Sequence, residues 1–203
     1  MNNLAGKQSS GNSDSTPNKS GPRPERSPTS APGVRAIVLV GFMGAGKTSV
    51  GKALGRRLGW PFEDLDDRIQ ARMGQTIEQI FQNRGESDFR RAETAALREL
   101  FNEPGPWPRV VALGGGAFVR SANTAVVKKA QAHTVFLGAG AQELFRRCQL
   151  EGVRRPLLRD LKQFRELYEQ RRPYYLKAHL RIETSGKDVA AIAAEVACSL
   201  GIS

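Results

Sequence analysis

The chain has 203 residues, of which 39% are hydrophobic and 25% charged, and its formal net charge is +11. These proportions are typical of a globular protein with a buried core, and no apolar run approaches the roughly 20 residues that cross a bilayer, so we expect no membrane partner. The amino terminus lacks an apolar secretory segment, and two cysteines are too few for a disulfide framework. We therefore expect a cytoplasmic protein with reduced thiols.

The basic residues are spread along the chain and form no compact basic block. Nucleic-acid-binding surfaces concentrate Lys and Arg on one face, and single-strand binders interleave them with aromatic side chains. Because neither pattern is present, we expect no nucleic-acid partner. Part of the positive charge is expected to bind anionic small molecules, and the rest to form a solvated surface.

Residues 1–33 are rich in Ser, Pro, Asn and Gly and carry few apolar side chains. Such a segment has too little apolar surface to offset the entropy cost of ordering it, so we predict a disordered tail. A transit peptide is the alternative, but the acidic residues Asp14 and Glu25 count against it. Residues 34–203 are expected to form one domain.

From Val34 onward, short apolar runs alternate with stretches of helical periodicity. Thr76 and Gln79 have the spacing of a capping box at a helix start. Alternating strands and helices indicate an α/β fold, a three-layer sandwich with a parallel sheet between two layers of helices. The predicted strands are 36–40, 61–64, 110–113, 134–137 and 179–182, and the predicted helices are 47–58, one opening at 76, and others near 88–101, 121–130, 140–148, 161–177 and 187–200.

The segment Gly41–Thr48, with the sequence GFMGAGKT, follows the first predicted strand and opens the first predicted helix. Glycines in this setting let backbone N–H groups surround phosphate, and the positive end of the helix favours the same anion. Lys47 would reach the β- and γ-phosphates of ATP, and the Thr48 hydroxyl would ligate Mg²⁺. The predicted ATP-binding residues of this segment and of the residue after it are Gly44, Ala45, Gly46, Lys47, Thr48 and Ser49.

The domain lacks the N-K-x-D and D-x-x-G sequences of a GTPase, and the strand at 110–113 ends in glycines, where a motor or transporter ATPase usually has an acid. The acidic partner of the magnesium ion is therefore expected from Asp64-Leu65-Asp66. Residues i and i+2 at the end of a strand share a face, so both carboxylates would face the γ-phosphate. Asp64 would hold Mg²⁺ through a water, and Asp66 would accept a proton from the acceptor hydroxyl. A solvated acidic helix start is the alternative interpretation.

The order of motifs in 34–203 closely resembles the shikimate kinase family. The resemblance rests on GFMGAGKT, on DLDD at 64–67, FRRAE at 89–93, GGGA at 114–117, RRPLL at 154–158 and RRPYY at 171–175. It implies a P-loop kinase fold with an acceptor-binding region at about 75–101 and a mobile lid at about 148–160. It also implies transfer of the ATP γ-phosphoryl group to the 3-hydroxyl of shikimate, a step toward chorismate and the aromatic amino acids.

The resemblance also assigns the residues that surround the acceptor. Asp66 would form hydrogen bonds with the ring hydroxyls and act as a base or an orienting group. Arg90 and Arg171 would bind the substrate carboxylate, because a guanidinium matches carboxylate geometry. Phe81 and Phe89 would form walls of the pocket. Arg91 is expected at the surface, because neighbouring helix residues point about 100° apart. The implied acceptor-binding residues are Asp66, Arg90, Gly115 and Arg171.

In the lid, the resemblance selects Arg155 over Arg154 as the arginine that contacts ATP. Arg155 would join Lys47 and Mg²⁺ in neutralising charge during the transfer. The sequence does not decide which residues contact adenine, because Ile182-Glu183-Thr184 stands where the family often has an Asp-Thr pair. Arg147 is a candidate for stacking on the base, although an extra residue before the lid obscures its register.

Two other functions stay open at this stage. A gluconate-type kinase on the same fold should lack the Phe-Arg-Arg and Gly-Gly-Gly pair, and a regulatory or nucleic-acid-binding protein with a phosphate loop would need a basic face. His133 and His179 receive no catalytic role. We expect a monomer whose partners are ATP and shikimate.

Overall fold

The computed structural model describes residues 34–105, 107–150 and 160–202. Five parallel strands form one sheet in the order β2-β3-β1-β4-β5. Each predicted strand is present, with its bounds shifted by at most one residue. The strands are β1 (Ala36–Val40), β2 (Phe62–Asp64), β3 (Arg109–Ala112), β4 (His133–Gly138) and β5 (Leu180–Glu183).

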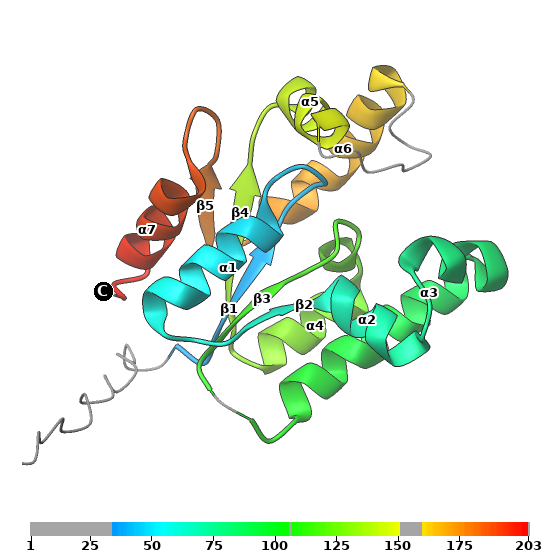
Figure 1. Cartoon of the computed structure of the whole chain (residues 1–203), viewed down its shortest axis with the longest axis horizontal. Helices are drawn as coiled ribbons and strands as arrows, with labels where there is room; N and C mark the ends of the chain where they lie inside the picture. Colours follow the sequence, from blue (N-terminus) through cyan, green and yellow to red (C-terminus); the bar gives the residue numbers. More distant parts are fainter. Residues whose placement is uncertain (1–33, 106, 151–159, 203) are drawn as a thin grey trace, which may run out of the picture.

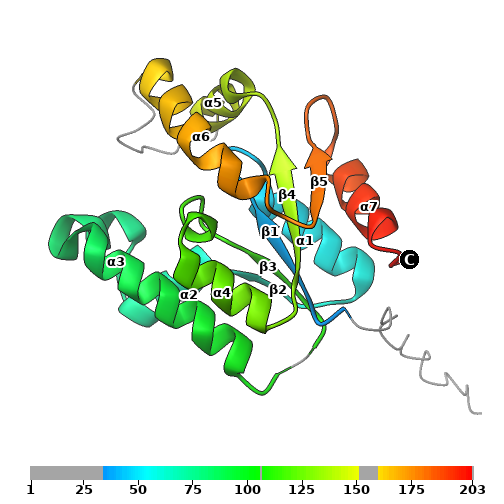
Figure 2. The ribbon, with the colours of Figure 1, turned by 180° about the vertical axis from the view of Figure 1, so that it is seen from behind.

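Helices cover both faces of the sheet. Figure 1 shows α1 and α7 on one face, and Figure 2 shows α3, α4 and α6 on the other. The predicted three-layer α/β sandwich is confirmed. The helices are α1 (Lys47–Leu58), α2 (Leu65–Met73), α3 (Ile77–Asn102), the 3-10 helix η1 (Ala117–Val119), α4 (Ser121–Lys129), α5 (Ala141–Leu150), α6 (Leu161–Tyr175) and α7 (Val189–Ser199).

The central strand β1 lies between β3 and β4, and all five of its residues are buried. A strand covered on both faces has no solvent side, which explains its continuous apolar sequence. In the register of the sheet, Leu39 and Asp64 both lie opposite Ala112. The carboxyl ends of β1, β2 and β3 therefore meet at one edge of the sheet. The connection after β1 runs toward β2, whereas the connection after β3 runs the opposite way toward β4. Ligands of open α/β sheets bind at such a change of direction.

The region between β2 and β3 differs from the expectation. Asp64 ends β2 and is also the N-cap of α2, since its Oδ1 accepts a hydrogen bond of 3.0 Å from the Asp66 backbone N–H. Asp66 therefore lies in the first turn of a helix, and the prediction that strand alternation positions it was wrong. A three-residue strand followed at once by an acid-capped helix explains the difference.

The next helix, α3, begins at the predicted capping box. Gln79 N–H donates to Thr76 Oγ1 at 3.2 Å, and Thr76 N–H donates to Gln79 Oε1 at 2.9 Å. Two helical segments join at Gly85, whose φ of 76° and ψ of 173° are not helical. The two helices predicted for this stretch are thus one kinked element.

Three expectations concern residues beyond the described ranges. The predicted tail, 1–33, is one, and the lid residues Arg154 and Arg155 are the others. Within the described ranges, no helix is both long and apolar enough to cross a membrane.

Candidate active site

The phosphate loop, Gly41–Thr48, connects β1 to α1. Gly46 is the N-cap of α1 and has a φ of 80°, a left-handed conformation that glycine adopts at little cost. Lys47 begins the helix, and its Nζ donates to the carbonyl of Phe42 at 2.9 Å. The lysine ammonium thus lies against the backbone of the loop, at the positive end of a helix, where a phosphate would bind.

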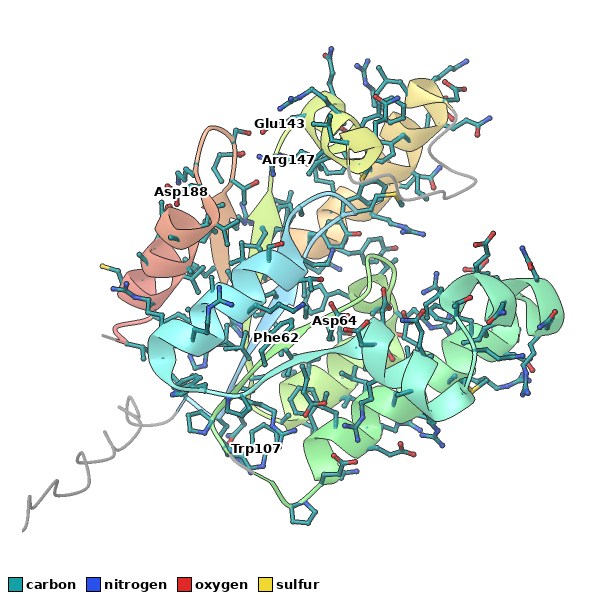
Figure 3. All side chains as sticks on the ribbon, in the orientation of Figure 1. Phe62, Asp64, Trp107, Glu143, Arg147 and Asp188 are labelled. Atoms are coloured by element: carbon teal, nitrogen blue, oxygen red, sulfur yellow. The ribbon has the colours of Figure 1, made fainter. Side chains whose placement is uncertain are left out.

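Thr48 and Asp64 bring two oxygen donors together beside this loop. The Thr48 hydroxyl donates to Asp64 Oδ2 at 2.7 Å, although 16 residues separate the two in sequence. Figure 3 shows Asp64 where β2 meets α2. Hydroxyl and carboxylate oxygens are the hard ligands that Mg²⁺ prefers, usually together with phosphate oxygens and water. The pair therefore fits the predicted magnesium site.

The loop after β3, Gly114–Gly116, is where the predicted acceptor-binding residues converge. A Cβ added at Gly114 would lie 2.6 Å from Asp66 Oδ1, and one added at Gly116 would lie 2.8 Å from both terminal nitrogens of Arg90. Both contacts are shorter than a side chain tolerates. The glycines therefore allow a carboxylate and a guanidinium to pack directly on the loop backbone.

Arg90 is held by two carboxylates on its own helix. It donates to Glu86 at 3.1 Å and to Glu93 at 3.0 Å, and its side chain is 13% exposed. The neighbouring Arg91 is 73% exposed and pairs with Asp88. The structure thus turns Arg90 inward and Arg91 outward.

Glu93 is fully buried behind Arg90 and is part of a polar network. Asn123 Nδ2 donates to Glu93 at 3.3 Å and to the Ala117 carbonyl at 3.0 Å, and the Thr94 hydroxyl donates to Asn123 Oδ1 at 2.7 Å. Burial raises the pKa of the Glu93 carboxyl above its ordinary value, while the Arg90 guanidinium opposes that rise. The network fixes the arginine from behind.

Arg171 and Tyr175, on the last turns of α6, meet the carbonyl of Gly115. Arg171 donates to this oxygen at 3.5 Å and its guanidinium lies 5.8 Å from the centre of the Phe42 ring. The Tyr175 hydroxyl donates to the same carbonyl. Burial raises the pKa of Tyr175, so the hydroxyl keeps its proton and remains a donor.

The predicted aromatic pair lies on either side of the kink in α3. The rings of Phe81 and Phe89 are 4.7 Å apart between centroids, and the Arg90 guanidinium lies 5.0 Å from the Phe89 ring. Phe89 is buried, whereas Phe81 is 37% exposed. Phe89 packs on Arg90 and the exposed Phe81 packs on Phe89, an arrangement that is consistent with a pocket wall.

Arg147 lies on α5, away from the acceptor residues. It donates to the hydroxyl and to the carbonyl of Thr184, both at 3.0 Å, and pairs with Glu143 one turn earlier. Figure 3 shows Glu143 and Arg147 on the side of α5 toward the β5–α7 loop. Hydrogen bonding to Ser185 and Arg147 lowers the pKa of Glu143. Arg147 and Thr184, the two uncertain candidates near adenine, therefore belong to one cluster.

The structure adds site residues that the sequence analysis did not assign. Glu93 stands three residues after Arg90 within the FRRAE motif, so helical spacing was a usable signal. Tyr175 is in the RRPYY motif, one turn after Arg171. Asn123 is 30 residues from Glu93, and no sequence pattern connects them.

Comparisons with known proteins agree with this geometry. The family model described as shikimate kinase matches residues 43–200. The shikimate kinase of Geobacter sulfurreducens is 42% identical over 167 residues, which are 80% of this chain and 89% of the relative.

Of two solved structures that resemble this chain, one is similar in both sequence and fold and the other in fold alone. A shikimate kinase from Acinetobacter baumannii in complex with shikimate has a TM-score of 0.75 and 35% identity, covering 83% of this chain and 94% of that one. A gluconokinase from Sinorhizobium meliloti has a TM-score of 0.58 at 20% identity, covering 83% and 93%, and shares the fold alone. With a family match over most of its length and relatives this similar, the chain belongs to the shikimate kinase family.

Proposed function

We propose that the chain transfers the γ-phosphoryl group of ATP to the 3-hydroxyl of shikimate, forming 3-phosphoshikimate and ADP. One observation carries the proposal: three consecutive glycines each meet one acceptor residue. Asp66 lies against Gly114, Arg171 against the Gly115 carbonyl, and Arg90 against Gly116. One carboxylate and two guanidinium groups around a single loop suit a ring that carries both hydroxyls and a carboxylate.

In the reaction, Arg90 and Arg171 would bind the substrate carboxylate and fix the ring. Asp66 would accept the proton of the 3-hydroxyl while the oxygen of that hydroxyl forms a bond to the γ-phosphorus. The bond between the γ-phosphorus and the oxygen that leaves with ADP would break at the same time. Lys47 would neutralise charge that develops on the transferred group. Catalysis would therefore consist mainly of positioning and charge neutralisation.

We propose that Thr48 holds Mg²⁺ directly and that Asp64 holds it through a water, supported by the 2.7 Å separation of their oxygens. When bound, the ion supplies positive charge to the phosphate oxygens. Asp64→Asn should raise the Mg²⁺ concentration that gives half-maximal activity, with shikimate affinity unchanged. An unchanged Mg²⁺ requirement would contradict this assignment.

Other parts of the proposal concern Arg155, Arg147 and the amino-terminal residues. Arg155 would contact ATP from the lid, so Arg155→Ala should slow phosphoryl transfer by at least about tenfold with little effect on shikimate binding. Arg147, held by Thr184, would stack on adenine.

Residues 1–33 would be a tail outside the kinase domain, and their deletion should leave activity within about threefold. A monomer acting in the cytoplasm completes the proposal, and light scattering of the purified chain tests its mass.

A coupled assay of ADP release tests the function directly. Shikimate should stimulate ADP release by at least about a hundredfold over no acceptor, whereas gluconate should not stimulate it. The Lys47→Ala variant measures contaminating activity in the same preparation. Stimulation by gluconate but not by shikimate would assign the chain to the other acceptor, and stimulation by neither would overturn the proposed reaction.

A further inference from the structure

A cavity of about 310 Å³ lies between α4, η1, the start of β4 and the end of α6. Its volume is at the lower end of the range of about 300–1,000 Å³ that small-molecule pockets occupy. It shares no residue with the proposed ATP and shikimate sites. We call it the α4–α6 pocket, and its lining includes Phe118, Val127, Lys128, Tyr174, Lys177 and His179.

The lining combines an apolar floor with cations at its edge. Phe118 and Val127 are buried, while Lys128 and Lys177 are exposed. Lys177 Nζ lies 5.1 Å from the centre of the Tyr174 ring. Neither lysine forms a salt bridge with a carboxylate in the part of the chain that the structure describes. Two such ammonium groups beside aromatic surface are suited to a ligand that has both a ring and a negative charge.

His179 adds an oriented hydrogen-bond donor. The Thr134 backbone N–H donates to His179 Nδ1 at 3.0 Å, and the His179 backbone N–H donates to Thr134 Oγ1 at 3.0 Å. A backbone N–H can only donate, so Nδ1 must be an acceptor and Nε2 carries the ring proton. The Nε2–H group of the ring is therefore available as a donor in the wall of the pocket.

On both α6 and η1, a residue that lines the α4–α6 pocket is next in sequence to a residue that forms a hydrogen bond with the acceptor loop. Tyr174 lines the pocket, whereas its neighbour Tyr175 donates to the Gly115 carbonyl. Phe118 belongs to η1, whose Ala117 N–H donates to the Gly114 carbonyl at 3.0 Å. A ligand that moves Phe118 or Tyr174 would therefore shift the backbone that positions shikimate.

We propose that the α4–α6 pocket binds a small carboxylate with a single flat ring, and that its occupancy changes shikimate affinity through η1 and the end of α6. The ring packs on Phe118 and Tyr174, and the carboxylate binds Lys128 and Lys177. An inorganic anion would leave the apolar floor exposed to water. This site lies beyond the proposed function, and its occupancy can be measured without turnover.

The binding test titrates benzoate and 4-hydroxybenzoate into the ¹⁵N-labelled full-length chain while shikimate saturates the acceptor site. Saturable amide shifts are expected at pocket positions such as Thr124 and Thr134. Lys128→Ala combined with Lys177→Ala should weaken binding at least about tenfold, whereas Lys129→Ala, a matched change one residue along α4, should alter it less than about twofold. Benzyl alcohol and inorganic phosphate should each bind at least about tenfold more weakly than benzoate.

Several results would overturn the site: no shifts with benzoate, equal binding by the double variant, or phosphate binding as tightly as benzoate. Coupling is tested by the Michaelis constant for shikimate at saturating benzoate. It should change at least about threefold in the parent chain and in Lys129→Ala but not in the double variant. An unchanged constant in the parent would overturn the coupling. A change that persists in the double variant would place benzoate in the acceptor site and overturn it as well.

Discussion

The phosphate end and the acceptor end of the proposed active site are built in opposite ways. The phosphate loop is one continuous segment, Gly41–Thr48, between a buried strand and its helix. The acceptor end gathers Asp66 from α2, Arg90 from α3 and Arg171 from α6 around Gly114–Gly116. The first depends on local backbone conformation, whereas the second exists only when distant elements pack correctly.

Their electrostatics differ in the same way. At the phosphate end, the main positive groups are backbone N–H groups, a helix terminus and Lys47. At the acceptor end, Arg90 is already surrounded by Glu86 and Glu93 before any substrate binds. The acceptor end therefore uses charged partners, one of them buried, to hold a single side chain in position. The phosphate end uses its backbone for the same purpose.

The largest expected effect is at the phosphate end. Lys47→Ala should lower the turnover number by at least about 1,000-fold, because it removes charge compensation from the transferred phosphate. Its melting temperature should stay close to that of the parent, because the side chain of Lys47 is only half-buried and its ammonium donates to a loop carbonyl instead of filling the core. Lys52→Ala, an exposed change one turn farther along α1, is the matched control. Shikimate-dependent ADP release at the parental rate would refute the role of Lys47.

The acceptor end is tested by Arg90→Ala. Loss of a charge-assisted contact to the substrate carboxylate should cost about 2–3 kcal/mol, or about 30- to 150-fold in the Michaelis constant for shikimate. The constant for ATP should stay unchanged. Arg91→Ala, on the exposed side of the same helix, should change neither.

Arg90→Ala also leaves the buried Glu93 without its cation, so the variant is expected to lose stability. Arg90→Lys separates the two effects, because it keeps the charge but loses the planar fork. It should recover most of the stability while shikimate binding remains weak. If instead the ATP constant rises and the shikimate constant does not, Arg90 belongs to the nucleotide site.

The same contrast explains what the sequence could predict. The strands and the phosphate loop follow from apolar runs, glycines and their order, all within short windows. The position of Asp66 did not follow, because Asp64 both ends a strand and caps the next helix, and nothing in the sequence distinguishes the two roles. The partnership of Glu93 and Asn123 depends on packing between α3 and α4, which hydrophobic periodicity does not encode.

A smaller effect is expected where backbone and side chain meet. Gly114→Ala places a Cβ 2.6 Å from Asp66 Oδ1, so the carboxylate must move from its present position. The ratio kcat/KM for shikimate should fall about tenfold, a typical loss for a misplaced catalytic group. Gly140→Ala has open space around its Cβ and should change the ratio less than about twofold. Equal behaviour of both variants would show that Asp66 does not depend on close approach to the loop.

The smallest effect concerns Glu93 and the pH dependence of stability. Burial raises the pKa of this carboxyl from an ordinary value of 4.5, and Arg90 opposes the rise. An acid with a raised pKa in the folded state holds its proton there while the unfolded chain has lost it, so stability falls as pH rises from about 4.5 through the raised pKa. Glu93→Gln removes this titration. Urea unfolding between about pH 4.5 and 7.5 should therefore show the free energy of unfolding of the parent declining relative to the variant.

The direction in which the unfolding free energy of the parent changes relative to Glu93→Gln shows whether burial or Arg90 has the larger effect on the Glu93 carboxyl. A decline with rising pH means that burial outweighs Arg90, so the protein gives up stability to hold the arginine in place. A rise with pH would mean that Arg90 and Asn123 overcompensate for burial and that the Glu93 pKa is lowered. In that case the network would stabilise the fold as well as position Arg90, and the contrast with the phosphate end would lie in geometry alone.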